Sequence, residues 1–188
     1  GSGGGGSLQM AAAGGGGLIL CQWAASLGAT VIGTVSSEEK AELAQAHGCQ
    51  HAIVTSKQDF VTEVERITSG AKLPVVYDSV GRDTFLRSLD CLRPRGLMVS
   101  FGNASGPVEP FTPLLLSQKG SLFLTRPTLF SYIATRTELE TAASELFEML
   151  LAGRLKIEVN QRFALRDAAE AHRALEARQT TGSTVFTV

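Results

Sequence analysis

Several features are scarce in this sequence, and each shortage excludes a class of protein. Only three cysteines occur among 188 residues, at positions 21, 49 and 91, with no second cysteine or histidine at ligand spacing. This excludes a disulfide scaffold, argues against structural zinc, and favours a reduced, cytoplasmic protein without a metal. No apolar run reaches the roughly 18–20 residues of a membrane span, so we expect neither a membrane partner nor a signal peptide.

An excess of either charge is also absent. The chain has 17 Lys and Arg against 18 Asp and Glu, for a net charge of −1. No basic face large enough for nucleic acid follows from that balance, so we expect no nucleic-acid partner. What the chain has is apolar content, 44% of its residues, and a length that is ample for a folded core.

The first ten residues have an unusual composition. Residues 1–7 are GSGGGGS, which is typical of a flexible linker, and residues 8–10 (LQM) resemble a cloning scar. We therefore expect residues 1–10 to be an engineered linker and scar outside the fold. On this interpretation the native sequence starts at Ala11, and the first β-strand of the fold is missing or replaced.

From Ala11 onward, apolar β-branched runs alternate with segments of helical periodicity. This alternation predicts an α/β fold with a doubly wound, mainly parallel sheet. The carboxyl ends of all the strands then share one edge, where such sheets bind ligands. The predicted strands are 29–35, 51–55, 73–78, 96–101 and 121–125.

A glycine-rich turn, Gly14–Gly17, leads into the first predicted helix. Glycines at a helix N-terminus let the backbone approach a diphosphate, whose charge meets free N–H groups and the positive helix end. A flexible junction next to the linker would also be rich in glycine, so the turn alone leaves both interpretations open.

The tip of the strand 29–35 is the place where a dinucleotide fold contacts the adenosine ribose. Ser36 and Ser37 follow that strand, and Lys40 lies one turn into the next helix. Two hydroxyls and a lysine suit the 2′-phosphate of NADPH through charge-assisted hydrogen bonds. A serine N-cap with a solvated lysine would give the same residues, and Glu38 or Glu39 could instead contact the ribose of NADH.

The residues that follow these motifs resemble a known family. The segments 11–17, 32–35, 75–81, 95–103, 118–122 and 125–127 are similar, in order and in spacing, to the zinc-free NADPH:quinone oxidoreductases of the medium-chain dehydrogenase/reductase superfamily. The resemblance covers essentially all of residues 11–188. It implies a homodimer in which NADPH reduces a quinone substrate, commonly by one electron.

The resemblance also assigns cofactor contacts, although no catalytic residue. It implies a pyrophosphate site in the glycine turn, a 2′-phosphate pocket, an adenosine contact, and two stretches near the nicotinamide. Without it, Phe101 could equally be core and Arg178 a solvated helix end. The implied residues are Gly14, Gly15, Gly16, Gly17, Ser36, Ser37, Lys40, Thr55, Phe101, Gly102, Asn103, Arg126, Pro127, Thr128 and Arg178.

The sequence departs from the family in three respects. Gly16 stands where relatives have a bulky apolar residue, and Thr55 stands where many have tyrosine. In addition, no segment of this sequence resembles the amino-terminal catalytic domain of the family, and we expect that domain to be absent. We therefore expect residues 11–155 to form the NADPH-binding, Rossmann-type domain of a fragment, and residues 156–188 to pack in the family on that absent domain.

Two other functions stay open at this stage. The chain could be a non-catalytic interaction module, because relatives pair through an edge strand and the segment 121–125 (SLFLT) is an apolar edge candidate. It could also belong to another zinc-free reductase of the same superfamily, acting on enoyl or alkenal substrates. Nothing in the chain identifies the quinone or enone.

Overall fold

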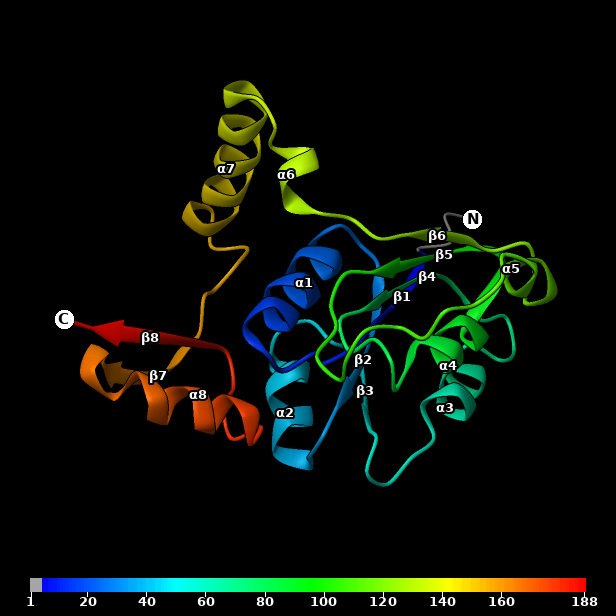
Figure 1. The fold of residues 1–188 in the computed structure, drawn as a ribbon, viewed down its shortest axis with the longest axis horizontal. Helices are drawn as coiled ribbons and strands as arrows, with labels where there is room; N and C mark the ends of the chain where they lie inside the picture. Colours follow the sequence, from blue (N-terminus) through cyan, green and yellow to red (C-terminus); the bar gives the residue numbers. More distant parts are fainter. Residues whose placement is uncertain (1–4) are drawn as a thin grey trace.

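The computed structural model describes residues 5–188, in which helices and strands alternate through most of the chain (Figure 1). No helix in this range is both long and apolar enough to cross a bilayer. The strands are β1 (Gly6–Gln9), β2 (Thr30–Val35), β3 (His51–Val54), β4 (Leu73–Asp78), β5 (Leu92–Ser100), β6 (Phe123–Thr125), β7 (Val159–Ala164) and β8 (Ser183–Thr187). The α-helices are α1 (Gly15–Ser26), α2 (Glu38–Ala46), α3 (Phe60–Ile67), α4 (Phe85–Asp90), α5 (Leu114–Gln118), α6 (Leu129–Tyr132), α7 (Arg136–Leu151) and α8 (Ala168–Glu176).

Six of the strands form one parallel sheet in the order β3-β2-β1-β4-β5-β6. The chain therefore starts at the centre of the sheet, winds outward to β3, and then crosses to β4 on the other side. This is the predicted doubly wound α/β fold. The crossing between β1 and β4 is the switch point at which such sheets bind ligands beyond the carboxyl ends of the strands.

The expectation that the first strand is missing is wrong. Residues 6–9, assigned from composition to the linker and scar, form β1 and pair with β2 on one side and β4 on the other. Leu8 and Met10 are fully buried. The strand forms in spite of its composition because two flanking strands supply hydrogen-bonding partners, which outweighs local β-propensity. The rest of the predicted linker, residues 1–4, lies outside the described residues.

Side-chain caps fix the starts of three helices. Ser37 accepts a hydrogen bond from the Lys40 backbone N–H and begins α2, as the sequence predicts, and Asp59 caps α3 in the same way. Thr135 and Glu138 form a reciprocal capping box at α7. Each cap satisfies N–H groups that lack a partner inside the helix. In contrast, Gly14 begins α1 without any side-chain cap.

The core lies on both faces of the central strands. One cluster joins Leu8, Val76 and Met98 of the sheet to α3 and α4, and the other packs α1 and α2 against β2. Asp78, at the end of β4, is fully buried and accepts hydrogen bonds from two backbone N–H groups and from the hydroxyls of Thr84 and Ser88. These contacts fix the carboxyl end of β4.

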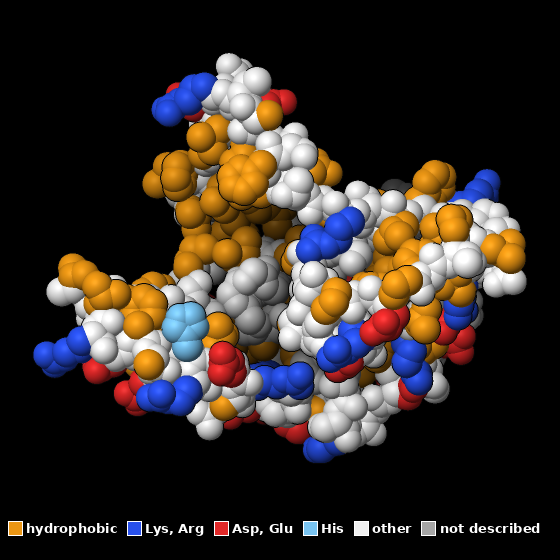
Figure 2. Space-filling model, in the orientation of Figure 1, with side chains coloured by type: hydrophobic (Ala, Val, Ile, Leu, Met, Phe, Trp, Pro, Cys, Tyr) orange, Lys and Arg blue, Asp and Glu red, His pale blue; other side chains and the backbone are white. Residues whose placement is uncertain are grey.

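The carboxyl-terminal third of the chain leaves the sheet. Beyond β6, α6 and α7 project away from it, and β7 and β8 form a separate two-stranded parallel sheet with α8 beside it (Figure 1). Hydrophobic side chains gather on α6 and α7 (Figure 2), including the exposed Phe130, Tyr132, Phe147 and Leu151. The expectation that residues 156–188 pack on a further domain stays a prediction.

The edge of the sheet differs in detail from the predicted strand 121–125. β6 spans only Phe123–Thr125 and lies at the edge, as expected. Leu122 is buried instead and donates its backbone N–H to the Leu116 carbonyl, because Gly120 and Ser121 turn the chain with positive φ. Leu122 therefore anchors the loop and is not an unpaired edge donor.

Candidate cofactor site

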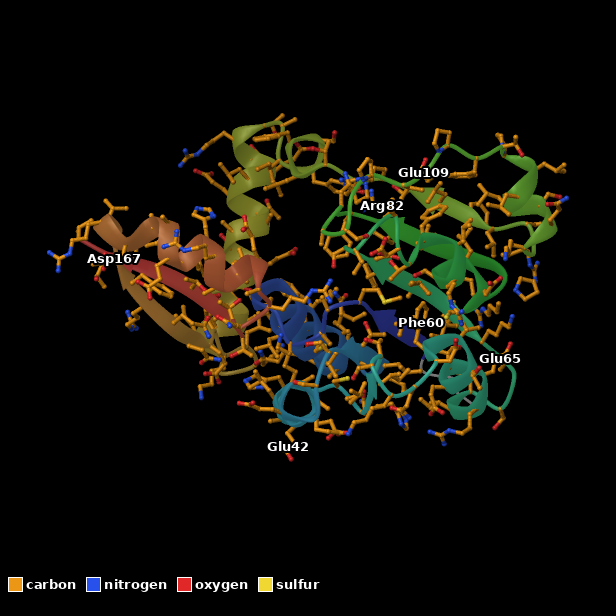
Figure 3. All side chains as sticks on the ribbon, turned by 60° about the horizontal axis from the view of Figure 1, so that its bottom comes forward. Glu42, Phe60, Glu65, Arg82, Glu109 and Asp167 are labelled. Carbon is orange, nitrogen blue, oxygen red and sulfur yellow. The ribbon has the colours of Figure 1, made fainter. Side chains whose placement is uncertain are left out.

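The predicted site residues lie where strands of the large sheet end. Gly14–Gly17 follow β1, Ser36 and Ser37 follow β2, and Thr55 follows β3. Residues 101–103 follow β5 and residues 126–128 follow β6. Because the strands are parallel, all five groups belong to one edge of the sheet. Figure 3 shows Arg82 and Glu109 in the loops on the β4 and β5 side of this edge, whereas Glu42 and Glu65 point outward from α2 and α3.

In the glycine turn, Gly17 lies close to the backbone of Ala11, whereas Gly16 faces open space. A Cβ on Gly17 would lie 2.3 Å from the Ala11 carbonyl oxygen, so only glycine fits there. A Cβ on Gly16 would meet nothing within 4 Å. The first N–H groups of α1 have no partner inside the helix, and no acidic side chain lies in its first turn. The open side of the turn is therefore suited to an anion.

A carboxyl-terminal segment covers another side of this turn. Gly182 pairs with Gly14 in a parallel bridge and donates its N–H to the Ala13 carbonyl at 3.1 Å. A Cβ on Gly15 would lie 3.1 Å from the Gly182 carbonyl and 3.2 Å from the Ser183 hydroxyl. Residues more than 160 positions apart thus form one surface beside the start of α1.

The tip of β2 collects the residues predicted for a 2′-phosphate. Lys40 Nζ donates to the Arg178 carbonyl at 2.8 Å, which brings the end of α8 to the start of α2. Ser37 caps the same helix. Ser36 is exposed beside it, and its carbonyl accepts a 3.5 Å contact from the Ser56 hydroxyl. The structure therefore brings all four predicted residues into one region.

The charges at this tip are not neutralised within the protein. Among residues 5–188, neither Lys40 nor Arg178 forms an ion pair. Glu38, the acid that could compete for a ribose, contacts Lys57 at 3.0 Å instead. The Lys40 ammonium, with serine hydroxyls close by and the backbone of Arg178 beside it, suits a dianion.

The remaining predicted contacts occupy neighbouring positions on the edge. Thr55 donates both its backbone N–H and its hydroxyl to the Val35 carbonyl, at 3.0 and 3.2 Å. The Phe101 N–H donates to the Asp78 carbonyl, and its ring is 39% exposed, so it is not core. A Cβ on Gly102 would lie 2.5 Å from the Ser79 carbonyl oxygen. Asn103 and the residues Arg126, Pro127 and Thr128 are on the loops that follow.

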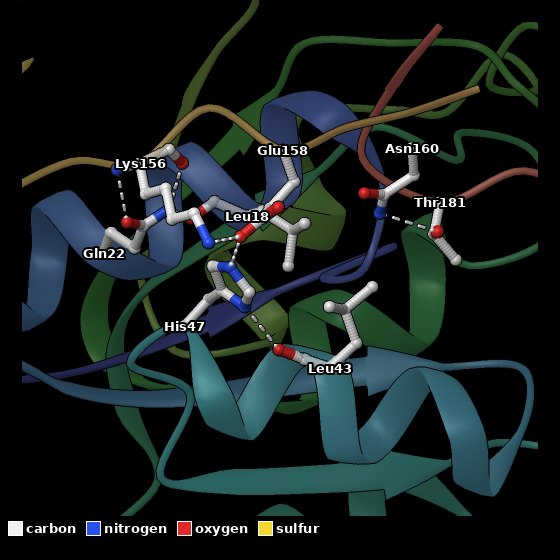
Figure 4. Close-up of polar contacts among 8 residues, drawn as sticks. All are labelled: Leu18, Gln22, Leu43, His47, Lys156, Glu158, Asn160 and Thr181. Atoms are coloured by element: carbon white, nitrogen blue, oxygen red, sulfur yellow. Dashed lines mark hydrogen bonds and ion pairs between the residues drawn. The ribbon is translucent and has the colours of Figure 1, made fainter. Parts of the chain in front are cut away.

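A polar clasp joins the segment 156–160 to the first two helices (Figure 4). Gln22 of α1 exchanges two hydrogen bonds with the Lys156 backbone, at 3.0 and 2.8 Å. His47, at the end of α2, contacts Glu158 through Nε2 at 2.9 Å and the Leu43 carbonyl through Nδ1 at 2.7 Å. The Lys156 ammonium and then the His47 ring hold the pKa of Glu158 below its usual range. The clasp has no counterpart among the sequence predictions.

The cysteines and the open grooves lie apart from this edge. All three cysteines are free and buried, and burial raises the pKa of Cys91 to about 12. No cluster of three or more potential metal ligands occurs within residues 5–188. An apolar groove of about 410 Å³ lies at the opposite, amino-terminal ends of β1, β2 and β4, where Trp23 and Pro74 line it.

Comparison with known proteins gives this geometry a context. Residues 15–148 match the family model described as zinc-binding dehydrogenase. The chain is 57% identical to a quinone oxidoreductase of Pseudomonas aeruginosa and 51% identical to a 2-haloacrylate reductase of Burkholderia sp, over 90% and 89% of its length. It spans about half of these relatives, 52% and 51% of their lengths.

Solved structures agree with the sequence relatives. The crystal structure of Escherichia coli quinone oxidoreductase complexed with NADPH superposes with a TM-score of 0.94 at 51% identity. The superposition covers 97% of this chain and 57% of that one.

Proposed function

Because the chain belongs to the zinc-binding dehydrogenase family, we propose that it binds NADPH and supplies the cofactor-binding half of a quinone oxidoreductase. The observation that carries the proposal is the tip of β2, where Lys40 and Arg178 lie together without a carboxylate partner in the described chain. A site for NADH would place an acid there to bind the ribose hydroxyls. A relative of known structure is complexed with NADPH, which supports the same assignment.

The residues present fit the cofactor. The unpaired N–H groups of the glycine turn would hold the pyrophosphate, beside the open space next to Gly16. Ser36, Ser37, Lys40 and Arg178 would hold the 2′-phosphate, and Thr55 would lie near the adenosine. The 39% exposed ring of Phe101, with Gly102 and Asn103, would form the wall beside the nicotinamide, and residues 126–128 would pass near that ring.

When bound, NADPH supplies the reducing equivalents, and the chain itself binds and orients the cofactor. The substrate we propose is a quinone, as in the relatives of Pseudomonas aeruginosa and Escherichia coli. Reduction of an activated carbon–carbon double bond is the second candidate, because a 2-haloacrylate reductase is 51% identical. Since the chain spans about half of these relatives, we propose that the rest of the substrate cleft comes from an additional domain, in a cytoplasmic enzyme.

A titration tests cofactor binding directly. The chain is added to NADPH and, separately, to NADH, and the change in nicotinamide fluorescence gives each dissociation constant. We expect NADPH to bind more tightly, because only NADPH carries the phosphate that Lys40 and Arg178 can contact. Equal affinities would contradict the assignment at β2, and the absence of binding to either would favour a non-catalytic interaction module.

We also propose that the chain forms a homodimer through β6, which lies at the edge of the sheet. Phe123 is 63% exposed on this strand, and a two-fold partner that presents the same strand would cover it. Phe123→Lys places two like charges at such an interface, so it should shift the chain from dimer to monomer in sedimentation velocity. A wild-type chain that sediments as a monomer at tens of micromolar would refute the proposal.

A further inference from the structure

Glu158 connects two parts of the molecule that are distant in sequence. Its side chain contacts His47 and Lys156, each at 2.9 Å. Its backbone carbonyl accepts the Ser183 N–H at 2.6 Å, and a Cβ on Gly182 would lie 2.5 Å from the same oxygen. Glu158 therefore contacts the segment 178–183 directly, whereas His47 belongs to α2.

His47 lies between two acceptors. Its ring nitrogens face the Leu43 carbonyl through Nδ1 at 2.7 Å and the Glu158 carboxylate through Nε2 at 2.9 Å (Figure 4). The carboxyl end of a helix favours a positive charge at this position. Among residues 5–188, Lys156 also pairs with Glu158, and the neighbouring α1 residues labelled in Figure 4, Gln22 and Leu18, are uncharged.

The segment held by this contact touches the candidate cofactor site near both of its ends. At its start, the Arg178 carbonyl accepts a hydrogen bond from Lys40. Near its end, Gly182 donates to Ala13 beside the glycine turn. The side chains of Asn160 and Thr181 add a further hydrogen bond at 3.0 Å. A displacement of Glu158 would therefore move Arg178 relative to the tip of β2.

We propose that His47 and Glu158 are a positioning pair that holds the segment 178–183 against α2. The pair thereby sets the affinity for the 2′-phosphate of NADPH, an inference that rests on the proposed function. Without the contact, the segment occupies its binding-competent position for a smaller fraction of the time. The apparent affinity for NADPH is the intrinsic affinity multiplied by the fraction of time that the segment spends in this position, so it decreases. NADH lacks the phosphate, so its affinity depends less on where Arg178 lies.

A double-mutant cycle tests the pair in the 188-residue chain. His47→Ala, Glu158→Ala and the double variant are titrated with NADPH and NADH by fluorescence. Because the two side chains are 11% and 19% exposed, we expect each single variant to bind NADPH about three- to fivefold more weakly. NADH affinity should change less than about twofold, and the double variant should bind NADPH no more weakly than Glu158→Ala.

Matched controls separate positioning from general damage to the fold. Glu42→Ala removes an outward-pointing side chain from the same helix (Figure 3), and His51→Ala removes an exposed histidine, so neither should alter NADPH affinity. His47→Gln keeps one N–H donor and should retain more affinity than His47→Ala. Far-UV circular dichroism checks that every variant is folded.

The outcomes distinguish this inference from the function on which it rests. Additive effects in the cycle, an equal loss of NADPH and NADH affinity, or unchanged binding by both single variants would overturn the positioning role while leaving NADPH binding intact. A folded wild-type chain that binds neither nucleotide would overturn the proposed function, and the inference with it.

Discussion

Two adjacent glycines in the first turn of α1 should respond in opposite ways to the same substitution. A Cβ on Gly16 meets no atom within 4 Å, and its φ lies outside the left-handed region. Gly16→Ala therefore adds no clash and reduces the conformational freedom of the unfolded chain. We expect stabilisation of about 0.4–1 kcal/mol. For a chain of this size, that corresponds to an increase in melting temperature of about 1–4 °C.

Gly17→Ala is the matched comparison, one residue further along. Its Cβ would lie 2.3 Å from the Ala11 carbonyl oxygen and 2.8 Å from the Ala12 carbonyl carbon. Both are backbone atoms, so relief requires the turn itself to move. We expect destabilisation of about 1–3 kcal/mol, the usual cost of overpacking. Urea unfolding followed by far-UV circular dichroism measures both variants, and a shift of the two midpoints in the same direction would refute the reasoning.

Three further predictions concern the phosphate residues, the clasp and β1. Lys40→Ala should weaken NADPH binding about tenfold, or about 1.4 kcal/mol, and should leave NADH affinity nearly unchanged. This value is near the lower end for a charged hydrogen bond because Lys40 is half-exposed. Equal losses of NADPH and NADH affinity in fluorescence titrations would contradict this prediction. Glu158 has a lowered pKa in the folded chain, so its stabilising contribution is present above the ordinary carboxyl pKa and is lost as pH falls through the lowered value. Wild type and Glu158→Gln should therefore differ in urea midpoint near pH 7 and converge as the pH falls below the lowered carboxyl pKa, whereas a constant difference would argue against the ion pairs. Gln9→Val should raise stability by about 1 kcal/mol in calorimetry, because the cost of burying Gln9 Oε1 without a hydrogen-bond partner in residues 5–188 exceeds the contribution of the Nε2 hydrogen bond to the Met10 carbonyl, which is also lost. A lower melting temperature would refute this.

The strands β2 and β4, on either side of β1, could be predicted from sequence because buried parallel strands are nearly continuous apolar runs. The runs at residues 30–35 and 73–78 are of this kind. β1 could not be predicted in the same way. Gly6 and Ser7 have little strand propensity, and β1 is ordered by β2 and β4 on its two sides. Leu122 shows a related limit, because the turn before it decides that its N–H points inward to Leu116.

Some residues of the candidate site could likewise be predicted from local sequence, and others could not. Gly14–Gly17, Ser37 and Lys40 belong to local patterns, a turn at a helix start and a cap at a strand tip, which sequence periodicity locates well. The contact between Lys40 and Arg178 joins residues 138 positions apart, and His47 meets Glu158 across 111 positions. No short-range pattern marks such pairs.

The glycine and serine content of β1 has a consequence for the order of folding. Ser7 pairs with Val31 and with Val75, so the centre of the sheet closes long loops before it gains any hydrogen bonds. A segment with so little local preference cannot nucleate the sheet, and β2 and β4 must first take up positions on either side of it. Leu8 is the one large apolar side chain within β1, so it alone resists a shift in register. We therefore expect the central strand of the native sheet to be the last to form and the first to lose its register when a neighbouring strand loosens.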